Sequence, residues 1–245
     1  MDLIMEKANE IWSIAEQYMP SPLPVPGAIT SAAEFLSAKA TSPSFPYTIR
    51  DVNLGSVVFW QAGLVILLQP IIWNVLARLE HYTRILSKAF GSPVRGTYAL
   101  GLWIFAGGIY RDLMFVEAMD RQRKVGWLAG VEYQVAGLVG MAVGLVLVLS
   151  SAYQLGVVGT YLGDYFGILM EKRVTGFPFN MFSDPMYDGS TLLFMGRAIV
   201  ARSPAGIVLS GWVYVVYRLA CMFEGPFTAK IYAERERQQR EEKEE

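Results

Sequence analysis

Cysteine and histidine are nearly missing from this chain of 245 residues, which contains one of each, Cys221 and His81. A lone cysteine forms no internal disulfide and cannot by itself build a thiolate metal site. A lone histidine excludes the clustered imidazole ligands that are typical of zinc and dinuclear centres. The composition therefore predicts a protein without a bound metal.

An excess of charge of either sign is also lacking, because 21 Lys and Arg residues face 22 Asp and Glu residues. This balance predicts no nucleic-acid partner. There is no G-x-S-x-G elbow, no Walker motif and no G-x-G-x-x-G after a predicted strand, which disfavours several soluble enzyme classes. Asp2, Glu6 and Glu10 stand where a signal peptide needs a basic start. Membrane insertion must therefore depend on later segments.

Long apolar segments are what the sequence does contain. Hydrophobic residues make up 53% of the chain, and their concentration in blocks indicates a membrane protein rather than a large soluble core. About 20 helical residues cross a hydrocarbon layer of about 30 Å. We predict three transmembrane helices, at Asn53–Val75, Val94–Phe115 and Tyr133–Val158. Arg111 and Asp112 are expected near the end of the second helix, within reach of the lipid headgroups.

The last apolar region, residues 191–223, is interrupted by Arg202, Ser203 and Pro204. We interpret it as a helical hairpin with arms at Tyr187–Ala201 and Ala205–Phe223. The predicted fold is thus an all-α integral membrane protein with three transmembrane helices and a C-terminal helical hairpin, four to five spans in total. The predicted domains are a preface at 1–50 with short amphipathic helices and a proline-rich turn, a membrane-embedded domain at 51–232, and a charged tail at 233–245.

The hairpin determines which loops share a side of the membrane. If the chain turns back, residues 159–180, 224–232 and 76–93 lie on one side, whereas one uninterrupted last span would separate 159–180 from 224–232. Arg78, Arg84, Lys88 and Arg95 favour the cytoplasm for the shared side. Basic residues in the opposite loop, 121–124, reduce this preference.

A first polar cluster follows the first predicted span. Asn74, Arg78 and His81 recur at helical spacing, as do Glu80 and Arg84. One interpretation is a salt-bridged helix end that reaches the headgroups. The other is a cationic pocket for a lipid phosphate, since Arg makes bidentate contacts to phosphate.

A second cluster, residues 159–180, is rich in glycine and aromatic residues, and a third combines "FSDPMYDGS" with "FEGPFTAKIY". Aromatic side chains are common at membrane interfaces, but the glycines favour a binding site because they permit close backbone approach. Asp164 and Glu224 are candidates to accept hydrogen bonds from ribose hydroxyls or to attract a cation. The "DP" and "GP" pairs are expected to stop the backbone sharply just outside the bilayer.

Four segments carry a resemblance to a known family: "PIIWNVLARLEHYTR.LSKAFGSP", "VLVLSSAYQLGVVGTYLGDYFGILMEKRVTGFPFN", "DPMYDGST" and "PFTAKIY". Over residues 70–232 the chain resembles the phospholipid N-methyltransferases of fungi and animals, especially the fungal branch that acts on phosphatidyl-N-methylethanolamine. The resemblance implies a multi-pass enzyme of the endoplasmic reticulum with its active site facing the cytosol. It also implies S-adenosylmethionine as methyl donor and phosphatidylcholine as final product.

The resemblance also implies where the methyl donor binds. The family has a G-x-G in the third span, where this chain has Ala142-Val143-Gly144, and a Glu-Glu pair where this chain has Glu224-Gly225. Gly144 could equally serve helix packing. The layout is similar to that of isoprenylcysteine carboxyl methyltransferases, which hold the cofactor before and after a terminal hairpin. With the clusters above, the expected cofactor contacts are Gly144, Gly163, Asp164, Tyr165, Phe179, Asn180, Tyr187 and Glu224.

Methyl transfer to an amine requires a neutral nitrogen, whereas alkylamines, like lysine, have a pKa of about 10. A base must therefore take a proton, and Glu224 is the first candidate, ahead of Asp164, Glu80 and His81. The phosphate of the bilayer lipid is assigned to Asn74, Arg78, His81 and Arg84. Alternatives are a membrane methyltransferase for a prenylated cysteine, a related sterol reductase, or a lipid-binding scaffold. Homo-oligomerisation stays open.

Overall fold

The computed structural model describes residues 51–171 and 174–244. The preface predicted for residues 1–50 lies outside this part of the chain. The described part is helical and contains no strand. Its elements are α3 (Val57–Thr83), α4 (Ile85–Phe90), α5 (Pro93–Asp120), η2 (Gly126–Ala129), α6 (Val131–Thr160), η3 (Gly163–Phe166), α7 (Pro185–Val200) and α8 (Pro204–Glu244).

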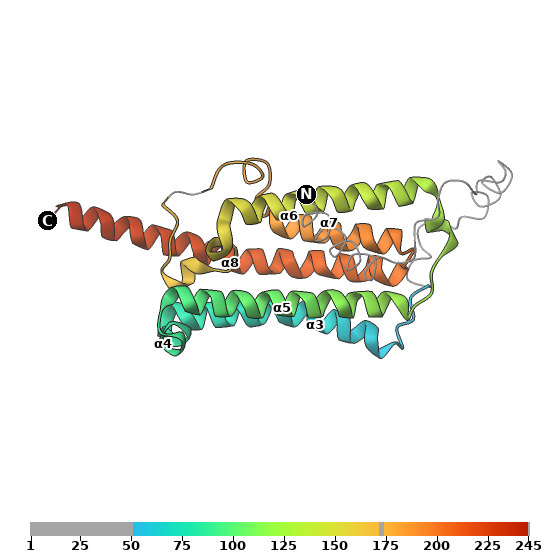
Figure 1. Cartoon of the computed structure of the whole chain (residues 1–245), viewed down its shortest axis with the longest axis horizontal. Helices are drawn as coiled ribbons and strands as arrows, with labels where there is room; N and C mark the ends of the chain where they lie inside the picture. Colours follow the sequence, from blue (N-terminus) through green and yellow to red (C-terminus); the bar gives the residue numbers. More distant parts are fainter. Residues whose placement is uncertain (1–50, 172–173, 245) are drawn as a thin grey trace, which may run out of the picture. The chain divides into compact units, whose positions relative to one another are not determined.

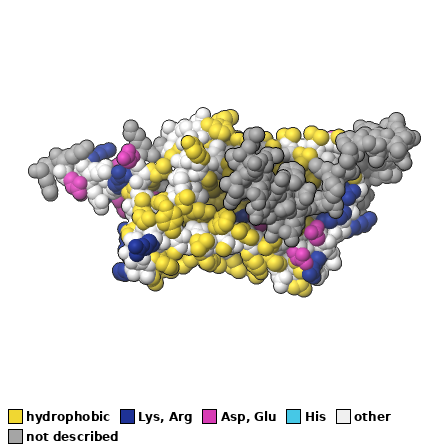
Figure 2. Space-filling view, viewed as in Figure 1, with side chains coloured by type: hydrophobic (Ala, Val, Ile, Leu, Met, Phe, Trp, Pro, Cys, Tyr) yellow, Lys and Arg dark blue, Asp and Glu magenta, His cyan; other side chains and the backbone are white. Residues whose placement is uncertain are grey.

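Four of the described helices, α3, α5, α6 and α8, are long and apolar enough to cross a membrane. Many of their large apolar side chains point outward, as Leu102 does with 69% of its surface exposed. Figure 2 shows hydrophobic side chains over the middle of the molecule and charged side chains toward its two ends. This distribution suits a lipid environment and confirms the predicted multi-span membrane fold.

The predicted hairpin is confirmed. Helices α7 and α8 pack side by side and are joined by residues 201–203 (Figure 1). Arg202 has a left-handed backbone with φ 55°, Ser203 Oγ accepts from the N–H of Gly206 at 3.1 Å, and Pro204 begins α8. This is the usual chemistry of a helix stop followed by a capped start. With 16 residues, α7 is shorter than the about 20 that a full span needs.

Glycines bring α6 and α7 into close contact. A Cβ on Gly144 would lie 2.5 Å from the carbonyl oxygen of Gly189, and one on Gly196 would lie 2.5 Å from that of Gly137. Only glycine allows two helix backbones to approach this closely. Of the two interpretations of Gly144, the helix-packing one therefore has a direct structural basis.

The segment that follows α6 and the C-terminal part of α8 meet on one side, as the hairpin prediction requires. Thr228 Oγ1 donates to Asp164 Oδ2 at 2.9 Å, and the Tyr232 hydroxyl accepts from the N–H of Met170 at 3.2 Å. Arg235 adds a bond to the Met170 carbonyl at 2.9 Å. These contacts reject the alternative of one uninterrupted last span, since that span would place residues 159–180 and 224–232 on opposite sides.

Two local expectations were wrong. Gly225-Pro226 does not stop the chain, because α8 continues through Pro226. A proline inside a helix crowds the carbonyl four residues earlier, and in the same turn the Phe223 carbonyl accepts a bond from Arg78 Nη2 at 2.8 Å. The second error concerns Arg111, which lies well inside α5. Its guanidinium packs over the Phe194 ring at 4.9 Å instead of reaching for the headgroups.

Candidate functional site

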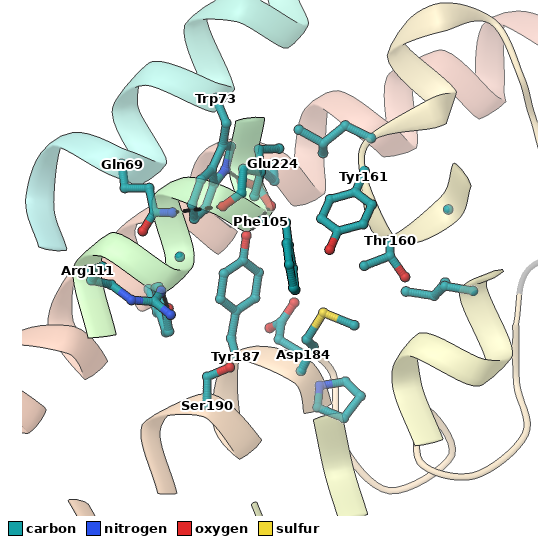
Figure 3. A pocket seen from close by; sticks show the side chains of 18 of the residues that line it. Gln69, Trp73, Phe105, Arg111, Thr160, Tyr161, Asp184, Tyr187, Ser190 and Glu224 are labelled. Atoms are coloured by element: carbon teal, nitrogen blue, oxygen red, sulfur yellow. Dashed lines mark hydrogen bonds between the residues drawn. The ribbon is translucent and has the colours of Figure 1, made fainter. Parts of the chain in front are cut away.

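A cavity of about 450 Å³ lies where α3, α5, the end of α6, the start of α7 and α8 come together (Figure 3). One part of its lining is polar, namely Gln69, Arg111, Asp112, Thr160, Ser183, Asp184, Ser190 and Glu224, and another is aromatic, namely Trp73, Phe105, Tyr161, Phe179, Tyr187 and Tyr217. Such a mixture of apolar surface and a few converging polar groups is typical of small-molecule sites.

Glu224 stands at the centre of the hydrogen bonding in this cavity. Trp73 Nε1 and Asn74 Nδ2 both donate to its Oε1 atom, each at 2.7 Å, and the Tyr187 hydroxyl donates to its Oε2 atom at 2.7 Å. Trp73 and Asn74 are consecutive on α3, and Tyr187 lies in the first turn of α7. Helices that are distant in sequence thus hold one half-buried carboxylate of α8 in a single orientation.

Arg78 holds Asn74 in this arrangement. Its Nη1 atom donates to Asn74 Oδ1 at 2.9 Å, which leaves the Asn74 amide nitrogen directed at Glu224. Its guanidinium also packs over the Phe227 ring at 4.8 Å. Arg78 does not line the cavity. Its contacts make it a positioning group for Asn74 and Glu224.

The start of α7 is held by ion pairs to α8. Arg218 Nη2 lies 2.9 Å from Asp188 Oδ1, and its Nη1 lies 3.7 Å from Asp184 Oδ2. Asp184 lines the cavity beside Tyr187. Pro185 begins the helix, a position where its missing N–H has no cost. The "DPMY" segment therefore places one carboxylate and one phenol toward the cavity.

Several residues that the sequence analysis selected do lie together. Glu224, Tyr187 and Phe179 line the cavity, and Asn74 contacts Glu224 directly. Asp164 does not line it, and its bond to Thr228 ties η3 to α8 instead. The remaining selected residues that lie outside the lining are Glu80, His81, Arg84, Gly144, Gly163, Tyr165 and Asn180.

Glu80 illustrates why helical spacing alone is insufficient. Its side chain is fully buried and accepts from the Ser87 hydroxyl and from the N–H groups of Leu86 and Ser87, at 2.7 and 3.1 Å. These donors belong to the first turn of α4, so Glu80 satisfies a helix N-terminus. The carboxylate has no access to the cavity and serves the turn between α3 and α4.

Aromatic packing explains two other selected residues. Tyr165 is fully buried and stacks on Phe227, with ring centroids 5.0 Å apart, and His81 meets the same ring edge-on at 5.2 Å. Phe227 thus joins the end of α3, η3 and α8. The aromatic residues of segment 159–180 mainly hold the helices together, whereas Tyr161 and Phe179 face the cavity.

Sequence reasoning missed Trp73, Gln69, Arg111 and Tyr217. Gln69 and Arg111 carried a usable signal, because a polar or charged side chain within an apolar span is by default a functional candidate. Trp73 and Tyr217 carried none, since aromatic residues are common in membrane helices. Gln69 Nε2 donates to the Ile104 carbonyl at 3.1 Å, while its Oε1 atom is buried without a partner in the described part of the chain.

The cavity also suits a cofactor of the S-adenosylmethionine type. Thr160 Oγ1 is buried and has no hydrogen-bond partner among the described residues, although it lines the cavity. Because buried polar atoms nearly always have a hydrogen-bond partner, this atom indicates that a bound ligand is its partner. Tyr161 and Phe179 offer faces for an adenine ring, and Glu224 and Asp184 offer carboxylates for ribose hydroxyls or a cationic sulfur. The residues present fit such a group.

Comparisons with known proteins bear on the same region. The sequence model of a family described as "Phospholipid methyltransferase" matches residues 133–235. The phosphatidyl-N-methylethanolamine N-methyltransferase of Emericella nidulans is 51% identical over 192 residues, 78% of this chain and 94% of that protein. The enzyme of that name from Saccharomyces cerevisiae is 46% identical over 189 residues, 77% and 92%. The phosphatidylethanolamine N-methyltransferase of Rattus norvegicus is 49% identical over 174 residues, 71% and 87%.

No solved structure matches the chain significantly. The geometry above therefore comes from this chain alone.

Proposed function

Because the chain belongs to the phospholipid methyltransferase family, we propose that it methylates phosphatidyl-N-methylethanolamine and then phosphatidyl-N,N-dimethylethanolamine to phosphatidylcholine. S-adenosylmethionine is the proposed methyl donor. The proposed location is the endoplasmic reticulum membrane, with the Glu224 end of the helices facing the cytosol. One observation carries the chemical part, namely the Glu224 carboxylate that three donors orient in a cavity reaching the lipid-facing surface.

The lipid substrate enters this cavity sideways from the bilayer. Phe105 and Ile109 of α5 line the cavity and are also 58% and 49% exposed on the surface that faces lipid. The amine headgroup can thus reach Glu224 while the acyl chains stay in the membrane. Leu155 and Gly159 of α6 line the cavity as well, so the proposed entrance lies between α5 and α6.

Glu224 acts as the proton acceptor in this proposal. Oε1 accepts two hydrogen bonds, from Trp73 and Asn74, whereas Oε2 accepts only one, from the Tyr187 hydroxyl. Oε2 is therefore the atom that takes the proton as an N–H bond of the lipid ammonium breaks and an O–H bond forms. The freed lone pair makes the nitrogen a nucleophile. When bound, S-adenosylmethionine supplies an electrophilic methyl group on a sulfonium centre. Orientation by the cavity walls contributes most of the acceleration, since no covalent intermediate is needed.

Aromatic side chains take the cationic headgroup in this arrangement. The rings of Trp73, Tyr161 and Tyr187 line the cavity around Glu224. Aromatic faces attract ammonium groups without accepting a proton, and they bind a quaternary ammonium as well as a tertiary one. They suit a reaction that adds methyl groups one after another, while Glu224 takes one proton from the ammonium in each transfer.

A reconstituted assay tests the proposed function and its rivals. The purified chain in nanodiscs is supplied with radiolabelled S-adenosylmethionine and, separately, with phosphatidylethanolamine and its mono- and dimethyl forms. We expect label in phosphatidyl-N,N-dimethylethanolamine and phosphatidylcholine. Transfer into a prenylated cysteine peptide instead, or sterol reduction with NADPH, would replace the proposal with one of the alternatives. Absence of any labelled lipid would refute it.

A further inference from the structure

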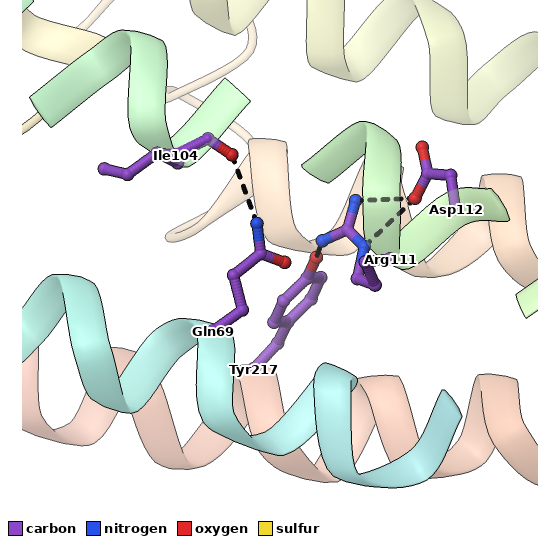
Figure 4. Close-up of polar contacts among 5 residues, drawn as sticks. All are labelled: Gln69, Ile104, Arg111, Asp112 and Tyr217. Carbon is purple, nitrogen blue, oxygen red and sulfur yellow. Dashed lines mark hydrogen bonds and ion pairs between the residues drawn. The ribbon is translucent and has the colours of Figure 1, made fainter. Parts of the chain in front are cut away.

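The inner part of the same cavity contains a polar group that the proposed proton transfer does not use. Arg111 Nε and Nη2 lie 3.0 and 2.9 Å from Asp112 Oδ1, and Arg111 Nη1 bonds to the Tyr217 hydroxyl (Figure 4). The Arg111 side chain is only 14% exposed, whereas that of Asp112 is 57% exposed. Gln69 lies across from them on α3, and its Oε1 atom has no partner in the described structure.

A charged pair within a membrane span carries a large desolvation cost, so it is retained where it meets a ligand or an aqueous cavity. Arg111 lines the cavity, and it is the only cation among the described residues that do so. Arg78, by contrast, does not line the cavity, and it donates to Asn74 and to the Phe223 carbonyl.

Contacts with two helices show how far Arg111 lies from Glu224 along the helix axes. Tyr217, which bonds to Arg111, precedes Glu224 by two helical turns on α8, and Phe194, over which Arg111 packs, follows Tyr187 by two turns on α7. Two turns correspond to about 10 Å along a helix. The rings of Tyr217, which bonds to Arg111, and Tyr187, which bonds to Glu224, pack against each other with centroids 4.9 Å apart, so the two polar groups belong to neighbouring parts of one cavity.

We propose that Arg111 binds the phosphodiester of the lipid while Glu224 receives its amine, an inference that rests on the proposed function. A guanidinium has five N–H groups, of which three make the bonds above, so N–H groups on Nη1 and Nη2 stay available at the tip of the fork. These two N–H groups can donate parallel hydrogen bonds to two oxygens of a phosphate. Tyr217 orients the guanidinium, and the exposed Asp112 compensates its charge until a lipid arrives. Arg111 thereby selects substrates with an anion beside the amine.

The test is a substrate-discrimination ratio. In nanodiscs, kcat/KM is measured for phosphatidyl-N,N-dimethylethanolamine and for a diacylglycerol ether of dimethylethanolamine, which has the same amine but no phosphate. We expect Arg111→Gln to reduce the ratio of the two values by roughly 10- to 100-fold, since a hydrogen bond to a charged group is lost. Arg111→Lys should restore part of it, because lysine keeps the charge without the planar fork.

Two further variants make the result specific. Asp112→Asn removes the competing carboxylate and should lower the KM for the phospholipid. Arg121→Gln is the matched control, because Arg121 is an exposed arginine of the distant α5 end, paired with Glu117, and its ratio should equal that of the wild type. If Arg111→Gln does not fold, Arg111→Lys and Asp112→Asn decide the question with the same ratio.

Each contrary outcome has a distinct meaning. An unchanged ratio in Arg111→Gln, with wild-type turnover of the phospholipid present, overturns the role of Arg111 and leaves the proposed function intact. If S-adenosylhomocysteine no longer stabilises Arg111→Gln against thermal unfolding, and the ratio of the two kcat/KM values is unchanged, the guanidinium binds the carboxylate of the methyl donor and the proposal is overturned. If the wild type methylates no lipid at all, the proposed function itself fails.

Discussion

Replacing Glu224 by glutamine changes the proposed base with the least change in shape. The amide oxygen of glutamine can still accept from Trp73 and Asn74, and its NH₂ group can donate to the Tyr187 hydroxyl, which becomes an acceptor. The three contacts of 2.7 Å are therefore retained, but as bonds between neutral groups. Hydrogen bonds to charged groups are stronger than neutral ones by about 1 kcal/mol each.

The stability effect is consequently small. Part of the loss is offset because a half-buried carboxylate no longer has to be desolvated, so we expect destabilisation of at most about 2 kcal/mol. Activity should respond far more strongly. A positioned general base contributes about 100- to 10,000-fold to a rate, and kcat with phosphatidyl-N,N-dimethylethanolamine should fall by that factor in Glu224→Gln.

The assay measures single-turnover transfer of radiolabelled methyl into lipid, alongside thermal unfolding in detergent. Glu117→Gln is the matched control, because it makes the same chemical change at an exposed carboxylate paired with Arg121, and it should leave kcat unchanged. A Glu224→Gln variant that is folded and retains more than about a tenth of wild-type kcat would refute the assignment of Glu224 as base.

Three other predictions concern residues around the site. Arg78→Ala should lower kcat by several-fold with little change in either KM, because the Asn74 amide loses its anchor; a rise confined to the lipid KM would restore the phosphate role first assigned to Arg78. Glu80→Ala should lower the unfolding free energy by about 2–4 kcal/mol, measured by thermal unfolding, since three donors lose their acceptor; loss of turnover without loss of stability would contradict this structural role. Gly144→Val should destabilise the protein by more than about 2 kcal/mol, whereas Gly211→Ala, where an added Cβ meets nothing within 4 Å, should not; equal unfolding midpoints in the two variants would speak against the α6–α7 contact.

The membrane fold was predictable from sequence because its signals are local and strong. Apolar runs and the interruption at Arg202-Ser203-Pro204 lead to the spans and the hairpin. Helix ends were less predictable, since α3 continues to Thr83 and α8 through Pro226. Contacts with other segments stabilise these polar extensions, and such contacts have no signature in a single stretch of sequence.

The candidate site was predictable only in part, for a related reason. Residues near one another in sequence suggested Glu80 and His81 as readily as Asn74, yet only Asn74 faces the Glu224 carboxylate. Which face of α3 turns inward depends on the packing of α3 against α5 and α8. Arg111 was assigned to the headgroup region because a long side chain can bend toward it. The structure instead places its partners Tyr217 and Phe194 in the interior.

Photochemical labelling by S-adenosylmethionine tests most directly that the Glu224 cavity is where methyl donor and lipid meet. The purified chain is irradiated with the radiolabelled cofactor, with and without excess S-adenosylhomocysteine, and the labelled peptides are identified. We predict competable label in the peptides that contain Tyr161, Phe179 and Tyr187, which line the cavity. Label that S-adenosylhomocysteine displaces but that falls entirely outside the cavity-lining segments would contradict the account.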